Sequence, residues 1–223
     1  MCADGNVRLT INRAGKRTEF VYYLGEERIA VEILESGRIL IKEGEIPDGK
    51  VVEYYREGGV KRVLRYRNEM AEGNGFVYYP TGELWEGQHF RNGKLDGQCV
   101  TYRKDGRVWS ECSYLRGKLH GPYNSYHESG QVEIATYYVK GRLHGPYERS
   151  DGSGFLREKG TFKNGRKDGI YITYHESGEI ASKIVYRDGR AIDTRDSEDE
   201  EHQSSVPSKG GRHGHERHLH HES

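Results

Sequence analysis

Hydrophobic and polar positions along the chain repeat with a period of 24 residues. We number positions by their distance from the first glycine of each unit, so that Gly49 is position 0. In all six units position 9 is glycine, position 11 is aliphatic and position 17 is aromatic. These columns are Gly49, Gly73, Gly97, Gly121, Gly145 and Gly169 (position 0); Gly58, Gly82, Gly106, Gly130, Gly154 and Gly178 (position 9); Val60, Leu84, Val108, Val132, Leu156 and Ile180 (position 11); and Tyr66, Phe90, Tyr114, Tyr138, Phe162 and Tyr186 (position 17). Such a period is typical of a stacked repeat.

Each unit is expected to be a β-hairpin, because two β-rich runs such as "CVTYR" and "VWSECSY" flank a short turn such as "KDG". If the position 9 glycine closes a three-residue loop, position 5 pairs with position 11. Position 5 is tyrosine except at Ser150. Positions 5, 11 and 17 are then predicted to share one face, with the even positions on the other. Cys99 and Cys112 are accordingly predicted to lie on opposite faces, where they cannot form a disulfide.

A third column, at position 20, is glycine except at Glu69, and it connects one hairpin to the next in segments such as "NGKLDG" and "KGRLHG". Because these connections are short, consecutive hairpins are expected to stay adjacent. We therefore predict an all-β fold, an elongated single-layer antiparallel sheet of consecutive β-hairpins. Each unit adds two strands, or about 9.6 Å, so that six units extend over about 58 Å.

The chain divides into three predicted parts. Residues 49–194 hold the six repeats, and residues 1–48 are divergent N-terminal hairpins that cap the sheet. Residues 195–223 are an acidic, then His-rich tail with too little apolar surface to order itself. Within the repeats, the unit from Gly145 to Lys167 has Ser150 at position 5 and a polar turn, "SDGSG", so we expect it to be the weakest hairpin.

The segment "LHGPYNSYHESGQVEIATYYVKGRLHG", from Leu119 to Gly145, resembles the variant form of the MORN repeat (membrane occupation and recognition nexus). The resemblance extends over about two thirds of the chain. It implies a non-enzymatic repeat scaffold for protein-protein interaction or assembly. It also implies two alternatives, which are an adaptor for acidic membrane lipids and an antitoxin-like neutralising protein or structural component of a larger particle.

Composition limits the partners and the compartment that can be expected for this chain. Charged residues make up 31% of the chain and hydrophobic residues only 33%. Outside the tail, 31 basic and 28 acidic residues leave a net charge of +3, so that no nucleic-acid partner is expected. No long apolar run and no signal-peptide pattern occur, which favours a soluble cytoplasmic protein without a transmembrane helix. The three cysteines, Cys2, Cys99 and Cys112, are interpreted as reduced thiols.

The polar residues that could act in catalysis or metal binding recur from unit to unit, whereas an active site needs them together in a single pocket. His120 and His144 share a column with Asp96 and Asp168. They are either polar turn residues or metal ligands; about 9.6 Å between neighbouring units is too far for a shared zinc ion. No catalytic residue, metal site or cofactor is predicted. The tail histidines either form a solvated low-complexity segment, which we favour, or bind a transition metal or change charge near pH 6.5. These are His213, His215, His218, His220 and His221.

Even positions of neighbouring units carry an aromatic set that includes both tryptophans of the chain. The set is Tyr55, Val77, Tyr79, Trp85, Trp109 and Tyr123. It is either a face that binds another protein, since interfaces are enriched in Trp and Tyr, or a surface that packs against the N-terminal hairpins or Lys and Arg stems. Self-association through open sheet edges is a further expectation. The candidate residues for anionic lipid are Arg62, Arg65, Arg67, Lys163, Arg166 and Lys167.

Overall fold

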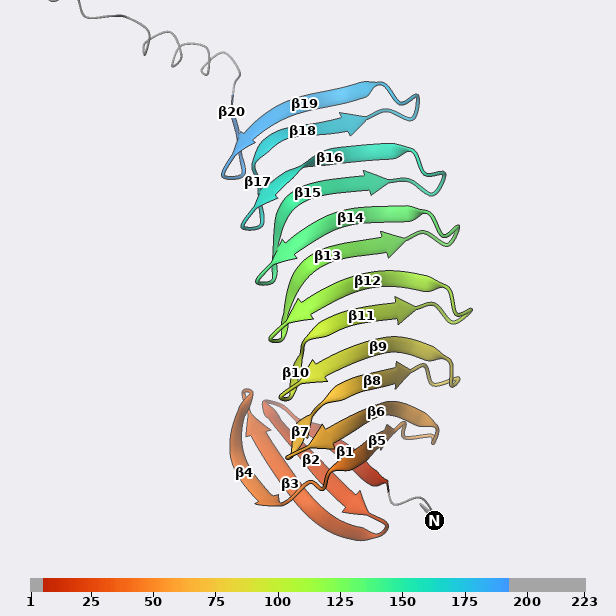
Figure 1. Cartoon of the computed structure of the whole chain (residues 1–223), viewed down its shortest axis with the longest axis vertical. Coiled ribbons are helices and arrows are strands. Elements are labelled where there is room, and N and C mark those ends of the chain that lie inside the picture. Colours follow the sequence, from red (N-terminus) through yellow and green to blue (C-terminus); the bar gives the residue numbers. More distant parts are fainter. Residues whose placement is uncertain (1–5, 193–223) are drawn as a thin grey trace, which may run out of the picture.

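The computed structural model describes residues 6–192, which form one sheet of twenty strands (Figure 1). Its elements are β1 (Val7–Ala14), β2 (Arg17–Leu24), β3 (Glu27–Glu35), β4 (Arg38–Gly44), β5 (Gly49–Tyr54), β6 (Val60–Arg67), β7 (Met70–Ala71), β8 (Gly73–Tyr78), β9 (Leu84–Arg91), β10 (Lys94–Leu95), β11 (Gly97–Tyr102), β12 (Val108–Leu115), β13 (Lys118–Tyr126), β14 (Val132–Val139), β15 (Arg142–Ser150), β16 (Leu156–Lys163), β17 (Arg166–Lys167), β18 (Gly169–Tyr174), β19 (Ile180–Arg187) and β20 (Arg190–Ile192). The described residues contain no helix that could cross a membrane.

The predicted fold class is confirmed. Six hairpins, from β5–β6 to β18–β19, follow one another along the chain and along the long axis of the molecule (Figure 1). The second strand of each hairpin pairs antiparallel with the first strand of the next, as β6 does with β8 and β12 with β13. Consecutive hairpins are therefore neighbours in space, and the ribbon is elongated.

The turn of each hairpin has the expected three-residue loop. In the first unit the Gly58 amide donates to the Tyr55 carbonyl (3.1 Å), and the Tyr55 amide donates to the Gly59 carbonyl (3.0 Å). Gly58 has a φ of +94°, in the left-handed region that glycine adopts without strain. As predicted, position 5 pairs with position 11, which places Tyr54 opposite Val60.

A β-bulge lies directly after this pair, and it changes which positions share a face of the sheet. The register shifts between Glu53 and Tyr54, so that Glu53 pairs with Arg62 and position 0 pairs with position 17. One extra residue moves every later side chain to the opposite face. The prediction that positions 5, 11 and 17 share a face was therefore wrong. The predicted placement of the cysteines on opposite faces was wrong for the same reason, because Cys99 and Cys112 lie directly opposite each other in β11 and β12; both are free thiols.

The connections between hairpins stack on one another through their backbones. The Gly117 amide, at position 20, donates to the Leu95 carbonyl of the preceding connection (2.7 Å), and Gly141 repeats this bond to Leu119 (2.7 Å). The residue before each of these glycines has a positive φ, 51° at Arg116, and its amide donates to a side chain. For Arg116 the acceptor is Asp96 Oδ2 (3.2 Å). The connections thus form a regular edge.

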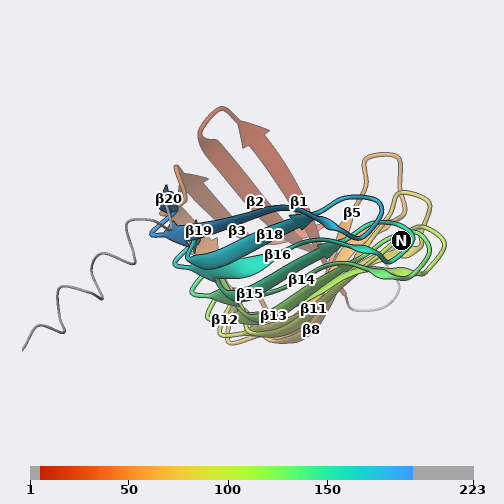
Figure 2. The same ribbon diagram turned by 90° about the horizontal axis from the view of Figure 1, so that it is seen from above.

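The hairpins bend across their length, so that the sheet forms a trough whose open side is partly covered by β1–β4 at one end (Figure 2). β1 pairs parallel with β5 through Val7 and Val51. We call the face that carries Val51, Tyr66 and Tyr171 the concave face, and the other the convex face. The main hydrophobic core lies at this end of the trough, where the strands β1–β3 and the β4–β5 segment fold over the first hairpin. It contains Val7, Leu9, Tyr22, Ala30, Ile46 and Val51, with Tyr66 packed against it.

Candidate interaction face

Aromatic rings run along the concave face in the C-terminal half of the ribbon. Tyr147 lies 5.4 Å from Phe162 and 6.4 Å from Tyr171 between ring centroids, and Tyr171 lies 6.2 Å from Tyr186. Rings at 4.5–7 Å attract one another beyond simple burial. Burial raises the pKa of the Tyr147 hydroxyl, and it raises that of Tyr114 to about 12. We call this row the aromatic ladder; it stabilises a sheet that has no second layer here.

Position 6 provides a second ladder, along the turns. Its side chain hydrogen-bonds a backbone carbonyl of the next unit: Tyr55 Oη donates to the Tyr78 carbonyl (2.6 Å) and Tyr79 Oη to the Tyr102 carbonyl (2.9 Å). His127 Nε2 continues the series at the Ser150 carbonyl (2.9 Å). These bonds tie neighbouring turns together, so that the hydroxyls of Tyr55 and Tyr79 already have a structural role.

The polar turn "SDGSG" is also hydrogen-bonded to the next unit, but through a different side chain. Asp151 stands at position 6, where a carboxylate cannot donate to a carbonyl. It accepts instead from the amides of Ser153 (2.9 Å) and Phe155 (3.1 Å) and pairs with Arg157 (2.5 Å). Arg157 Nη1 then donates to the His175 carbonyl (2.5 Å). The relative stability of this hairpin stays a prediction.

Most of the predicted aromatic set gathers on the turn side of the concave face. Tyr79 and Trp85 lie 6.0 Å apart between ring centroids. Trp85 is 39% exposed and Trp109 is 46% exposed, in neighbouring units. We call Tyr55, Tyr79, Trp85 and Trp109 the turn-side aromatic cluster; Val77 lies beside Trp85 in one cleft. Tyr123 shares the face but belongs to the aromatic ladder, 5.8 Å from Tyr138.

Cationic side chains cover part of the cluster. Lys61 Nζ lies 5.9 Å from the Tyr55 ring centroid, and Lys104 Nζ lies 5.7 Å from that of Tyr79. The Arg103 guanidinium lies 5.8 Å from the Trp109 ring. These distances are within the range of cation–π attraction. The rings therefore have partners on one side and remain half exposed on the other.

Two clefts adjoin the cluster where the N-terminal strands leave the repeats. β1 pairs with β5 over three residues only, from Val7 to Leu9, and then diverges. The gap holds a cleft of about 480 Å³ that reaches from Arg8 to Tyr55 and a second of about 240 Å³ that Ile11 and Trp85 both line. Both contain Glu53, which is 6% exposed. The sequence could not reveal these clefts, because they depend on a contact between distant segments.

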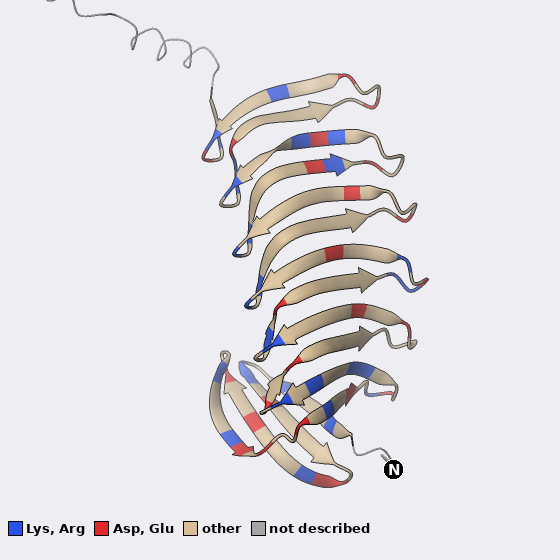
Figure 3. Cartoon of the chain, viewed as in Figure 1, with Lys and Arg blue, Asp and Glu red and all other residues tan. Residues whose placement is uncertain are grey.

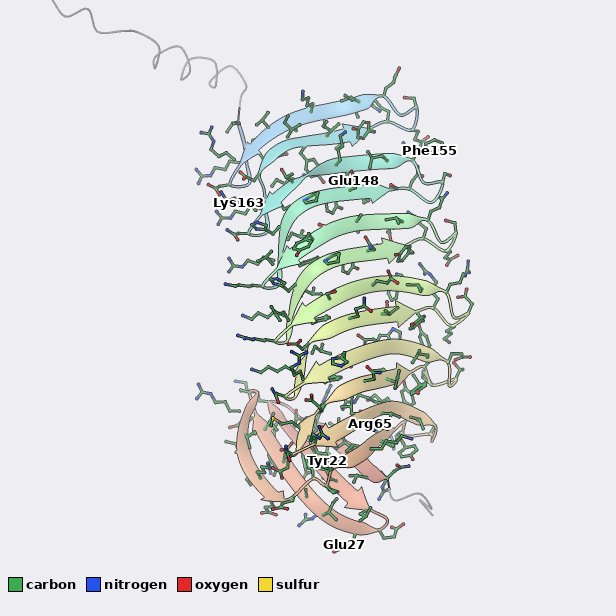
Figure 4. The ribbon with its side chains drawn as sticks, in the orientation of Figure 1. Tyr22, Glu27, Arg65, Glu148, Phe155 and Lys163 are labelled. Atoms are coloured by element: carbon green, nitrogen blue, oxygen red, sulfur yellow. The ribbon has the colours of Figure 1, made fainter. Side chains whose placement is uncertain are left out.

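Glu53 is held in the clefts by two ion pairs. Lys61 Nζ lies 2.7 Å from one carboxylate oxygen and Arg62 Nη2 lies 3.1 Å from the other. A buried carboxylate without such partners would be costly. Arg62, a predicted lipid contact, is therefore engaged with Glu53 on the concave face, whereas Arg65 is exposed on the convex face (Figure 4).

Basic residues gather at the connections, along one long edge of the ribbon (Figure 3). We call this the connection edge. It carries Arg67, Arg91, Lys94, Arg116, Lys118, Lys140, Arg142, Lys163, Arg166, Lys167, Arg187 and Arg190. Lys163 projects from this edge and Phe155 from the opposite edge, where the turns mix acidic and basic residues (Figures 3 and 4). The net charge of the chain gave no indication of this row, although the recurrence of basic residues every 24 residues could have predicted it.

Cys99 and His120 both form hydrogen bonds within the sheet. The Cys99 thiol donates to Glu86 Oε1 (3.0 Å), and its hydrogen bond with Cys112, together with burial, raises its pKa. His120 Nδ1 accepts from the Lys140 amide (3.5 Å), the position that Asp96 takes one unit earlier. This bond favours the turn-residue interpretation. Within residues 6–192 no three His, Cys, Asp or Glu side chains form a group that could hold a metal ion. Cys2 and the tail histidines lie outside the described residues.

Comparison with known families identifies the repeat. A family model described as "MORN repeat variant" matches residues 119–140 and 167–188. The two matches begin 48 residues apart, twice the period, so they cover the same part of two units. Two of the six units are thus similar to the MORN repeat variant. Such repeats are generally associated with scaffolds that bind proteins or lipids, and they are typically non-catalytic. No curated protein matches the chain.

Proposed function

We propose that this chain is a non-enzymatic scaffold that binds another protein through the turn-side aromatic cluster and the clefts beside it. The observation that carries the proposal is the pair of half-exposed tryptophans, Trp85 and Trp109, in neighbouring units of one face. Tryptophan and tyrosine are the side chains that most often provide binding energy at interfaces. Neutralisation of a toxin-like partner, or incorporation into a larger particle, would use the same face.

The packing alternative accounts for only part of the cluster. Trp85 lines a cleft with Ile11 of β1, so the N-terminal strands cover one side of it. Trp109 lies one unit further along the ribbon and is more exposed, with Arg103 as its cationic neighbour. The cleft beside Trp85 also contains Glu53, Lys61 and Arg62, charged groups that can orient a partner. A partner segment that lies in the cleft and extends over Trp109 fits this arrangement.

The experiment replaces both tryptophans. We expect Trp85→Ala with Trp109→Ala to reduce recovery of a co-purified partner at least about tenfold, because interface tryptophans often contribute 2 kcal/mol or more each. The measurement is affinity purification with quantitative mass spectrometry, followed by titration calorimetry with the purified partner. Circular dichroism checks that the variant is folded.

A matched control removes two aromatic rings of similar exposure from the convex face. These are Phe76, 36% exposed, and Tyr137, 39% exposed. We expect Phe76→Ala with Tyr137→Ala to leave partner recovery unchanged. Unchanged recovery in the tryptophan variant, or an equal loss in the control, would reject the concave face as the binding surface.

The second candidate function is attachment to an anionic lipid surface through the connection edge. The observation in its favour is that Arg67, Lys163, Arg166 and Lys167 of the predicted lipid set lie in the regular basic row of that edge. Each Lys or Arg near an anionic surface contributes about 1 kcal/mol, and the contributions accumulate when the residues lie in a row.

Vesicle flotation tests this candidate. We expect the protein to float with vesicles of phosphatidylcholine and phosphatidylserine at low salt, and to lose binding at high salt or with phosphatidylcholine alone. Replacement of Arg116, Arg142 and Arg166 by Gln should reduce flotation, whereas the tryptophan variant should float normally. Absence of salt-sensitive flotation would reject the lipid candidate and leave the protein-binding proposal intact.

A further inference from the structure

The connection edge presents its basic side chains outward, while most of its acidic side chains are occupied. Asp96 accepts from the Arg116 amide (3.2 Å) and lies 3.9 Å from Arg91. Asp168 and Glu72 accept from connection amides in the same way, at 3.4 Å and 2.8 Å. All of the basic residues of this edge are exposed except Lys167, which is half-buried. The edge therefore presents an excess of exposed positive charge to the solvent.

The positive charge recurs at regular intervals. Each connection contributes at least one basic residue, and successive connections are separated by two strands, or about 9.6 Å. An extended chain in the polyproline II conformation advances about 3.1 Å per residue with three residues per turn, so every third side chain points the same way and lies about 9.3 Å further on. An extended segment with an acidic residue at every third position would match the edge, one charge for each connection.

The chain itself carries such a segment next to the edge. Its last described strand, β20, pairs with β19 from Arg187↔Arg190 to Val185↔Ile192, so the chain leaves the described structure at the outermost connection (Figure 1). The residues that follow read "DTRDSEDEE". Six of these nine are acidic, and Asp193, Asp196 and Asp199 have the spacing of three.

We infer that the acidic segment 193–201 docks along the connection edge of its own chain. Nine residues in the polyproline II conformation reach about 28 Å, which covers the connections at 163–167 and 140–142, at about 10 and 19 Å, and brings the last carboxylates within side-chain reach of 116–118, at about 29 Å. Because the segment is tethered beside the edge, its effective concentration there is in the millimolar range, so that weak individual ion pairs suffice. The docked segment neutralises the basic row and competes with any other anion for it.

Zero-length cross-linking tests this contact in the full-length protein. A carbodiimide joins a carboxylate to an amine only when the two touch, and an equal mixture of ¹⁴N and ¹⁵N protein separates links within a chain from links between chains. We expect links within one chain from residues 193–201 to Lys163, Lys140 and Lys118. We also expect them to disappear at about 1 M salt, where the screening length is about 3 Å.

The edge variant removes charge without removing the reactive amines. It replaces Arg116, Arg142, Arg166 and Arg190 by Gln and should give about tenfold fewer tail-to-edge links, since the individually weak contributions of four exposed charges are lost together. A matched control replaces four exposed arginines elsewhere: Arg17, Arg28, Arg38 and Arg56. Lys42 and Glu69, whose charged atoms lie 2.5 Å apart, should be linked in every variant and report that the fold is intact.

Three results would overturn the inference. The first is an absence of tail-to-edge links while Lys42 and Glu69 are linked. The second is an equal loss of links in the control variant, which would show that total charge and not the edge attracts the segment. The third is the presence of tail-to-edge links only between differently labelled chains, which would assign the contact to a second copy.

Discussion

Individual glycines of the concave face show how tightly neighbouring units fit. A Cβ atom on Gly75 of β8 would lie 2.5 Å from Leu64 Cδ2 and 2.9 Å from Phe90 Cε2. A Cβ atom on Gly160 of β16 would overlap the ring of Tyr171, the next aromatic of the ladder. Glycine at these positions leaves room for a neighbour's ring. Gly87 of β9, on the convex face, has no atom within 4 Å of its Cβ position.

We expect Gly75→Ala to lower the free energy of unfolding by about 1–3 kcal/mol, because the added methyl group displaces Leu64 and Phe90. Gly87→Ala is the control in the same hairpin. It should leave stability unchanged or raise it by about 0.5 kcal/mol, because alanine has less conformational freedom in the unfolded chain. Urea denaturation followed by circular dichroism measures both. Equal effects in the two variants would show that the concave face is not closely packed around Gly75.

The hairpin unit shows what a repeat pattern predicts and what it leaves open. The glycine at position 9 predicted the three-residue loop and the pairing of Tyr54 with Val60, and both are present. The bulge that follows was missed, because it has no residue signature of its own: position 12 is Lys61, Trp85, Trp109, Glu133, Arg157 or Ala181. A bulge is stabilised by the backbone ladder on both sides, which only the assembled sheet provides.

The backbone pairing between units has the same register at every step, so that one complete unit should be removable. Deletion of residues 121–144 joins His120 to Gly145, and the new junction reads "HGPY" as the original does. We expect this variant to fold cooperatively and to be shorter by about 9.6 Å, since two strands are lost from the sheet. Circular dichroism and the maximum dimension from small-angle X-ray scattering measure the two effects.

The control for this deletion removes half a unit. Deletion of residues 121–132 would place β14 directly after β12, and these two strands run in the same direction. A short connection cannot join parallel neighbours, so we expect this variant to misfold or aggregate. If it folded as well as the 24-residue deletion, the period would not be the unit of stability.

At the scale of the whole molecule, the features with functional potential come from the arrangement of units rather than from any one of them. The bend of the sheet makes a trough, and the fold-over of β1–β4 closes one end of it around Tyr22 and Val51 (Figure 2). The same fold-over opens the clefts beside Trp85. The regular stacking places a basic residue at every connection, which gives a chain without net charge a strongly basic edge.

The sequence alone determined the period, the hairpins, the turn type and their order along the chain, because these depend on residues that are close together and recur six times. It also placed both tryptophans in neighbouring units. Only the tertiary structure decided which face each column occupies, since one bulged residue per unit reverses that assignment. The capped trough, its clefts and the basic edge are likewise tertiary, because they arise where distant segments meet: β1 against β5, and each connection against the next.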